Sequence, residues 1–451
     1  MEYRELTTNG VVLDKKQLED YLEKIASDQI LQNNSDKDTY PIPRVKENFE
    51  KIKEVYRLLN EHIKLGIPIH PAGEWLLDNF YVIEETTKAI CKELTLKKYK
   101  KFLGIANGNR KGFARIYVLA SEIAAYTDNK IESNQVKDFI QAYQKKKTLS
   151  MEEIWNIGLF IQIALIQNIK QICDKIYFSQ MQNYLVENIL ERLVENKEEL
   201  KYKDLSEYKT KVKGYGEMKY PFIEYMSYRL KKYGKTAYSF KEALEEQVNK
   251  MGSSIEEIVK KEHFDIAVKK VSMANSITSM KELLRIDFLD IFEKINGVED
   301  ILKKDPVKVY EKMDYKTKEC YRNEIKQISA KAKISEIYIA QKVLEIAEKE
   351  YKTLGKDKRA HVGYYLIDKG KTELLKSLHL PIPKLQKENT KLKIYISIIW
   401  GISAVLAIGF GIYLQKQLHS YVLSALLALF LWITFVLANL SNILVMPGYI
   451  A

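Results

Sequence analysis

The amino-acid sequence predicts an all-α protein in which two helical soluble domains are followed by a transmembrane helical hairpin. Three observations lead to this prediction. Apolar residues recur at helical spacing ahead of Ile394, helix-capping and helix-stopping residues flank these stripes, and two long uncharged stretches follow. No run of alternating apolar and polar residues is long enough to predict a sheet.

The hairpin is predicted at 394–445. Ile394–Leu414 carries no charge over about 21 residues, which at about 1.5 Å per residue spans a bilayer core of about 30 Å. After the polar link 415–420, Tyr421–Val445 is again uncharged and long enough to return. The alternative is two buried core helices, but the remaining chain is too polar to wrap helices that are apolar on every face. The lipid bilayer is therefore an expected partner.

The lysines around the first uncharged stretch set the predicted orientation. Lys384, Lys387, Lys391 and Lys393 precede it, whereas the connecting link carries only Lys416. The positive-inside rule then places both termini in the cytosol, with the chain in the inner (cytoplasmic) membrane.

Composition limits the function classes. The net charge is +12, yet Lys and Arg alternate with Asp and Glu in almost every segment, so no basic stripe predicts nucleic-acid binding. Two lysine clusters, 97–101 and 145–147, are interpreted either as a solvated face or as a contact with anionic lipid or phosphate. The three cysteines are widely spaced, without a CxxC pair or a nearby His, so we expect buried thiols and no metal or cofactor site.

The first 43 residues are expected to hold one amphipathic helix, around Lys15–Ile25, and a mobile polar link. The first helical domain, 44–196, then opens with a helix at 44–65 that stops at Gly66. Pro71 begins the next helix, since proline in the first turn leaves no needed donor missing.

The helix that begins at Pro71 carries weak candidate binding residues. Trp75 and Phe80 are predicted to be structural and buried, while Glu74, Asp78 and Asn79 lie on or beside the same face. Two interpretations remain open for the acids. They hold a cation or perform acid–base chemistry, or they cap helix ends and pair with Arg110 or Arg115, the structural role that we favour because no metal-ligand spacing accompanies them.

The rest of the first domain is predicted to be a turn at 104–112 followed by helices at 113–126, 133–147, 150–172 and 178–195. Ser150 and Glu153 form a capping box at the start of the third of these helices, and Trp155 contributes to its apolar side as a structural residue.

The polar stretch 197–220 is the predicted domain boundary. In the second helical domain, 221–385, helix starts are predicted at Ser239 with Glu242, at Ser253 with Glu256, and at Asp287, Asp314 and Ser335. Stops are predicted at Gly252, Gly297 and Gly355.

Five segments, at 71–85, 149–169, 262–295, 313–325 and 363–370, resemble the N-terminal region of cyclic β-1,2-glucan synthases. They begin with PAGEWLLDNFYVIEE and end with GYYLIDKG, and the likeness extends over roughly 70–445 in the family's order. The resemblance implies a protein associated with a membrane glycosyltransferase that makes β-1,2-glucan from UDP-glucose on the cytosolic side of the membrane.

The family's transferase and phosphorylase-like domains have no counterpart in this sequence. The Arg-Trp dipeptide of the acceptor-binding motif is missing, and the Asp-Lys-Asp at 36–38 lies in a polar link, so we predict no catalytic residue and no cofactor. Gln162 and Gln167 stand where the family pattern has an Arg and a Glu. The chain is therefore interpreted as a shortened member or a separately encoded front piece.

The sequence supports a membrane-tethered, cytosolic helical module that supports or positions a glycosyltransferase domain acting in trans. Two alternatives stay open: a truncated remnant of such a synthase, and a membrane-anchored helical module that binds a protein or an anionic ligand.

Overall fold

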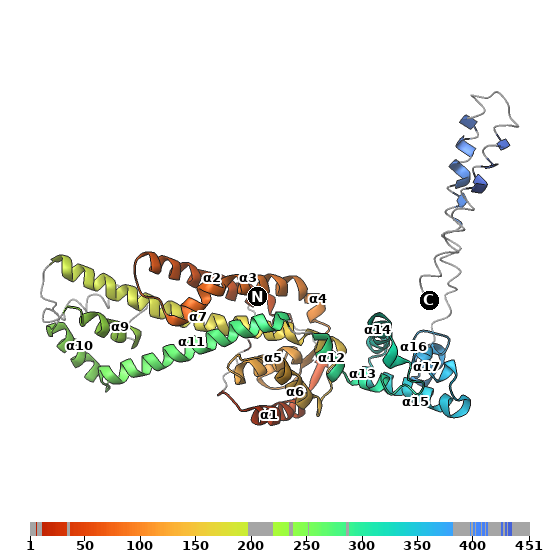
Figure 1. Ribbon diagram of the computed structural model, residues 1–451, viewed down its shortest axis with the longest axis horizontal. Helices are drawn as coiled ribbons and strands as arrows, with labels where there is room; N and C mark the ends of the chain where they lie inside the picture. Colours follow the sequence, from red (N-terminus) through yellow and green to blue (C-terminus); the bar gives the residue numbers. More distant parts are fainter. Residues whose placement is uncertain are drawn as a thin grey trace. The chain divides into compact units, whose positions relative to one another are not determined.

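The computed structural model describes residues 6, 11–33, 37–196, 220–233, 238–250, 252–285 and 288–381, with scattered positions between 397 and 434. The chain divides into two compact units, Met1–Asp368 and Lys369–Ala451. The described residues are mostly helical, which confirms the predicted helical class (Figure 1).

The first part of Met1–Asp368 contains helices and one small sheet. In chain order its elements are α1 (Lys15–Asp28), β1 (Leu31–Asn33), α2 (Ile42–Lys64), α3 (Pro71–Glu93), α4 (Leu96–Tyr99), β2 (Leu103–Ile105), η1 (Gly108–Arg110), α5 (Arg115–Tyr126), α6 (Ser133–Gln144) and α7 (Met151–Asn196). The antiparallel pair of β1 and β2, with Leu31 opposite Ile105, was not predicted. At three residues per strand, these segments are too short for alternation to show in the sequence.

The helix α7 differs from the prediction, because one helix of 46 residues replaces the two predicted at 150–172 and 178–195. The link 173–177 holds neither glycine nor proline, and Cys173 and Ile176 within it are fully buried. The apolar stripe therefore continues through the predicted break, and nothing in the backbone interrupts the helix.

The later part of Met1–Asp368 holds the other helices that the structure describes in that unit. They are α9 (Tyr220–Leu230), α10 (Tyr238–Lys250), α11 (Ile255–Arg285), α12 (Phe288–Ile295), α13 (Gly297–Leu302), η3 (Tyr310–Lys312), α14 (Tyr315–Ala332), α15 (Glu336–Leu354), η4 (Lys358–Ala360) and α16 (Val362–Leu366).

Local capping signals placed several of these helices correctly. Asp314 caps α14 by accepting a hydrogen bond from the Thr317 amide at 3.2 Å, as predicted. The cap of α11 lies one residue later than predicted, because the Ser254 hydroxyl, not Ser253, accepts from the Glu257 amide at 3.2 Å.

The long helices form the body of Met1–Asp368. α11 packs against α3 and α7, and α2 packs against the same two helices (Figure 1). Gly73 of α3 faces the Leu59 side chain of α2 so closely that a methyl group there would contact Leu59 Cδ1 at 2.9 Å. These two helices therefore approach each other at a position that only glycine fits without a shift.

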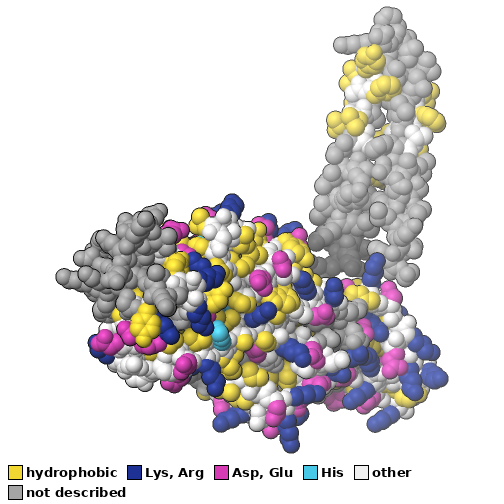
Figure 2. Space-filling view, turned by 60° about the vertical axis from the view of Figure 1, so that its left-hand side comes forward, with side chains coloured by type: hydrophobic (Ala, Val, Ile, Leu, Met, Phe, Trp, Pro, Cys, Tyr) yellow, Lys and Arg dark blue, Asp and Glu magenta, His cyan; other side chains and the backbone are white. Residues whose placement is uncertain are grey.

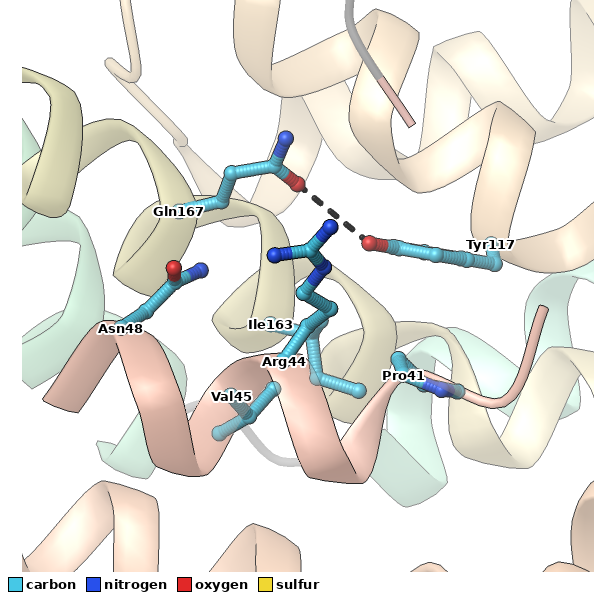
Figure 3. Close-up of a pocket in the computed structure, with 7 residues that line it drawn as sticks. All are labelled: Pro41, Arg44, Val45, Asn48, Tyr117, Ile163 and Gln167. Carbon is cyan, nitrogen blue, oxygen red and sulfur yellow. Dashed lines mark hydrogen bonds between the residues drawn. The ribbon is translucent and has the colours of Figure 1, made fainter. Parts of the chain in front are cut away.

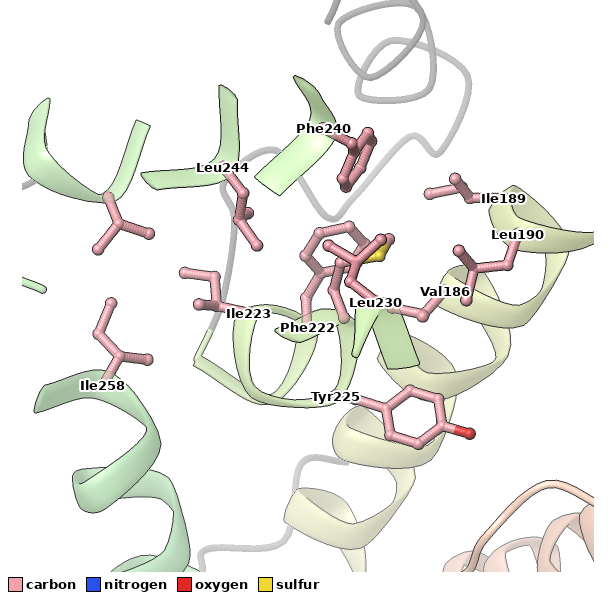
Figure 4. Packing of buried hydrophobic residues seen from close by; sticks show 12 residues of the cluster. Val186, Ile189, Leu190, Phe222, Ile223, Tyr225, Leu230, Phe240, Leu244 and Ile258 are labelled. Atoms are coloured by element: carbon pink, nitrogen blue, oxygen red, sulfur yellow. The ribbon is translucent and has the colours of Figure 1, made fainter. Parts of the chain in front are cut away.

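A hydrophobic cluster joins helices from both sides of the predicted boundary at 197–220 (Figure 4). α7 contributes Val186, Ile189 and Leu190, and α9, α10 and α11 contribute the rest, namely Phe222, Ile223, Tyr225, Met226, Leu230, Phe240, Leu244, Val248 and Ile258. Residues 197–219 themselves lie outside the described residues.

Polar residues of α13 and of the segment that follows it form hydrogen bonds with η3, α14 and the start of α16. Glu299 accepts hydrogen bonds from Arg322 at 3.1 Å and from the Tyr310 hydroxyl at 2.8 Å. Asp305 contacts His361 Nδ1 at 2.9 Å and accepts from the Val362 amide at 3.1 Å.

In Lys369–Ala451 the structure describes α17 (Lys371–Ser377) and scattered helical residues. Trp432 Nε1 donates to Ser403 Oγ at 3.1 Å, and the Trp400 and Trp432 rings meet edge to face with centroids 6.1 Å apart. The two uncharged stretches are therefore beside each other at these positions. Most of the predicted hairpin, 394–445, lies outside the described residues, and among those that are described no helix has the length and apolarity needed to span a bilayer.

Candidate functional site

The acidic residues predicted on α3 lie at the surface. Glu74 and Asp78 are exposed, while Trp75 and Phe80 are partly buried, and the Phe80 ring stacks on Tyr56 with centroids 4.2 Å apart. Asn79 is buried and accepts a hydrogen bond from Lys281 of α11 at 2.6 Å. Its amide therefore fastens α3 to α11.

The predicted arginines pair with acids other than Glu74 and Asp78. Arg110 forms an ion pair with Glu122 of α5. Arg115 Nε and Nη2 donate to the two carboxylate oxygens of Glu153 at 2.7 and 2.6 Å, and Nη2 also donates to the Thr148 carbonyl at 2.9 Å. The structure thus uses both arginines for helix packing.

The capping box predicted at the start of α7 is confirmed. The Ser150 amide donates to Glu153 Oε2 at 2.8 Å, and the Glu153 amide donates to Ser150 Oγ at 3.3 Å. The α7 start also contacts the later helices, since the Met151 amide donates to Glu336 of α15 at 2.8 Å.

Trp155, predicted on the apolar side of α7, is 46% exposed. Its ring meets Phe292 of α12 edge to face at a centroid distance of 5.5 Å, and Arg322 covers the Phe292 ring at 5.4 Å. Trp155 therefore packs against Phe292 while much of its side chain stays at the surface.

A small polar cavity lies between α2, α5 and α7 (Figure 3). Arg44, Asn48, Tyr117 and Gln167 line it, with Pro41, Val45 and Ile163. Gln167 accepts from the Tyr117 hydroxyl at 3.3 Å and donates to the Leu6 carbonyl at 2.6 Å. The cavity volume is about 10 Å³, which is room for about one water molecule. The Gln167 amide therefore fastens Leu6 to α7.

A larger polar cleft, which sequence reasoning missed, lies between the α5–α6 turn, α7 and α11. Its volume is about 200 Å³. Its polar lining is Asp128 and Asn129 from the turn, Asn168, Gln171 and Lys175 from α7, and Asp265, Lys269 and Ser272 from α11, with Ala125, Ile172 and Val268 completing it. We call these residues the polar cleft.

The floor of the polar cleft is held in a fixed shape. Asp128 and Asn129 have φ of 49° and 62°, a left-handed conformation that Asp and Asn adopt more readily than other non-glycine residues. Ser272 Oγ donates to Asp128 Oδ1 at 2.5 Å, and Asn275 Nδ2 donates to Asp128 Oδ2 at 3.2 Å. Asn168 Nδ2 donates to Asn129 Oδ1.

Two ionisable residues at or near the polar cleft, Lys269 and Glu262, are buried on α11. Lys269 is 8% exposed and pairs with Asp265 one turn before it on α11. Burial lowers the pKa of Lys269, and the nearby Glu262 carboxylate opposes that shift. Burial also raises the pKa of Glu262, whose Oε1 has no hydrogen-bond partner among the described residues.

His70 lies at the N-cap of α3, within the electrostatic reach of Lys269. Its Nδ1 accepts from the Ala72 amide at 3.1 Å, so the ring is held in one orientation. Burial lowers its pKa to about 4, and the positive charge of Lys269 acts in the same direction. In the described part of the chain, no three His, Cys, Asp or Glu side chains are grouped so as to hold a metal ion.

The surface charge shows no single-sign region on the face that Figure 2 presents. Lysine and arginine side chains alternate there with aspartate and glutamate, between patches of apolar side chains. This agrees with the interspersed charges of the sequence.

No protein-family model matches the chain. It is similar to the cyclic β-(1,2)-glucan synthase NdvB of Rhizobium meliloti (strain 1021), with 22% identity over 338 residues. The aligned stretch is 74% of this chain and 12% of NdvB, so the chain spans a small fraction of the curated relative. The comparison confirms a distant resemblance to part of a cyclic β-glucan synthase.

Proposed function

We propose that this chain is a membrane-tethered helical module that supports or positions a glycosyltransferase domain making β-glucan from UDP-glucose. The observation that supports it best is the extent of the resemblance, since 74% of the chain aligns with a stretch of the Rhizobium synthase. A likeness over that length is more than one short motif. The aligned stretch is 12% of NdvB, so the link between this chain and the activity of the whole synthase is itself proposed.

The way in which the chain uses its charged residues fits a supporting role. The buried arginines form ion pairs within the chain, Arg115 with Glu153 and Arg322 with Glu299. Such pairs fix the relative placement of α5, α7, α13 and α14, because a charge removed from water requires its partner to stay in place. A rigid body of this kind is suited to holding another domain in position.

Co-expression with a transferase domain of the resembled synthases would test the proposal. We expect the two proteins to co-purify, and we expect the chain alone, supplied with UDP-glucose and magnesium or manganese, to release no UDP above background. A matched control fuses residues 382–451 to an unrelated soluble domain, which keeps the membrane segment and removes the helical body. Capture of the transferase by the fusion would mean that the helical body has no part in binding.

Two results would overturn the proposal. Turnover by the isolated chain would show that it is itself a transferase. A transferase that neither binds this chain nor changes its activity in its presence would favour a remnant of a longer synthase.

A further inference from the structure

The polar cleft contains both fixed and available hydrogen-bonding groups. The Asp128 carboxylate already accepts hydrogen bonds from Ser272 and Asn275, and the Asn129 amide oxygen accepts one from Asn168. In contrast, within the described part of the chain no hydrogen bond or ion pair involves the Gln171 amide or the Lys175 ammonium. Both groups are exposed, and with Asn168 they lie on one face of α7, at spacings of three and seven residues.

The volume of the polar cleft admits a molecule larger than water. One water needs roughly 10–15 Å³, and the polar cleft offers about 200 Å³. Its floor on the α5–α6 turn is held in place because hydrogen bonds from α11 fix the left-handed residues Asp128 and Asn129. A ligand would therefore bind to a floor that is already ordered.

The charges that line the polar cleft are balanced. Asp128 and Asp265 carry two negative charges, and Lys175 and Lys269 carry two positive charges. A nucleoside diphosphate or free phosphate would gain from the lysines and be repelled by the carboxylates. No aromatic side chain is among the lining residues, so a nucleobase would find no ring on which to stack.

The available groups suit hydroxyls. An ammonium donates, an amide both donates and accepts, and an engaged carboxylate retains lone pairs, so neighbouring groups match a molecule whose hydroxyls each donate and accept. We propose that the polar cleft binds a small neutral polyhydroxylated molecule, of the size of one or two sugar rings, through Gln171, Lys175 and the Asp265–Lys269 pair. This inference rests on the lining chemistry alone, so it stands or falls separately from the proposed transferase-supporting function.

Saturation-transfer NMR and calorimetric titration of the purified full chain would test this assignment, with glucose, a glucose disaccharide and myo-inositol as probes. Glycine and inorganic phosphate serve as charged comparison probes. We expect binding of at least one polyhydroxylated probe and none of glycine or phosphate.

Substitutions of Gln171 and Lys175, the exposed residues that form the rim of the polar cleft, would identify the site. Gln171→Ala and Lys175→Ala should each weaken binding about tenfold, the effect of one lost hydrogen bond to a charged or polar group, without changing the thermal unfolding temperature. The matched control is Lys170→Ala, on the same helix, whose ammonium pairs with Asp174 at 2.7 Å outside the polar cleft. It should bind as the parent chain does.

Three outcomes would overturn the assignment. They are no binding of any polyhydroxylated probe, equal binding by the parent chain and both rim variants, or preferential binding of glycine or phosphate. The last outcome would assign the polar cleft to a charged ligand.

Discussion

Arg115 and Glu153, 38 residues apart in the chain, form a buried two-point ion pair that fastens the start of α5 to the start of α7. Both side chains are at most 3% exposed. The same Glu153 carboxylate completes the capping box with Ser150, so one acid closes a helix end and neutralises an arginine. A cation in the first turn of α5 opposes the helix dipole, and the carboxylate offsets that unfavourable term.

Removing one partner of this pair should strongly destabilise the fold. Arg115→Ala leaves Glu153 as a buried, uncompensated charge, so we expect a loss of about 3–5 kcal/mol in the free energy of unfolding, measured by chemical denaturation. The matched control is Lys51→Ala, which breaks the exposed pair with Glu54 and should cost at most about 1 kcal/mol. Equal effects of the two substitutions would contradict the assignment of a buried pair.

Gly363 is expected to tolerate no larger side chain. A methyl group at this position would overlap the Tyr321 hydroxyl and crowd His361 Nε2, so Gly363→Ala should cost about 1–3 kcal/mol in unfolding free energy. Combining it with Tyr321→Phe removes the hydroxyl and should recover part of that loss, a coupling that a double-mutant cycle measures. Strict additivity of the two changes would rule out the proposed overlap.

His70 should make the fold less stable in acid. Its folded-state pKa is about 4 against an ordinary 6.5, so the folded state binds fewer protons between these values. Stability is therefore unaffected by this group above about pH 6.5 and falls as pH drops toward about 4, by up to about 3 kcal/mol.

Unfolding measured from pH 7 to pH 4 would reveal this term. His70→Asn removes the titrating ring, and asparagine still accepts at the N-cap of α3, so its stability should depend less on pH than that of the parent chain. A pH dependence that is the same in His70→Asn as in the parent chain would exclude His70 as its source.

The predicted membrane orientation is open to chemical labelling. Because the lysines before Ile394 outnumber the one in the 415–420 link, both termini should lie in the cytosol. An impermeant thiol reagent applied to intact cells should modify a cysteine placed at Gln417 and spare one placed at Lys387. The parent chain measures background labelling, and the reversed pattern would contradict the predicted orientation.

Features that depend on neighbours within one helical turn were predictable from the sequence. Ser150 with Glu153, Asp314 before α14 and Gly355 after α15 were read from the chain because a cap is made by residues three or four positions apart. The helical class followed from periodicity in the same way. The cap of α11 was misplaced by one residue because two adjacent serines precede two adjacent glutamates, and spacing alone does not choose between them.

The contacts between distant residues depend on helix packing and were not predictable from the sequence. Helix packing pairs Arg115 with Glu153 and leaves Glu74 and Asp78 at the surface. It also brings together Asp128, Asn168 and Ser272 in the polar cleft. The periodicity of the sequence does not show these pairings. A buried charge pairs with the partner that helix packing brings within reach, and that packing depends on the whole apolar surface that is buried together.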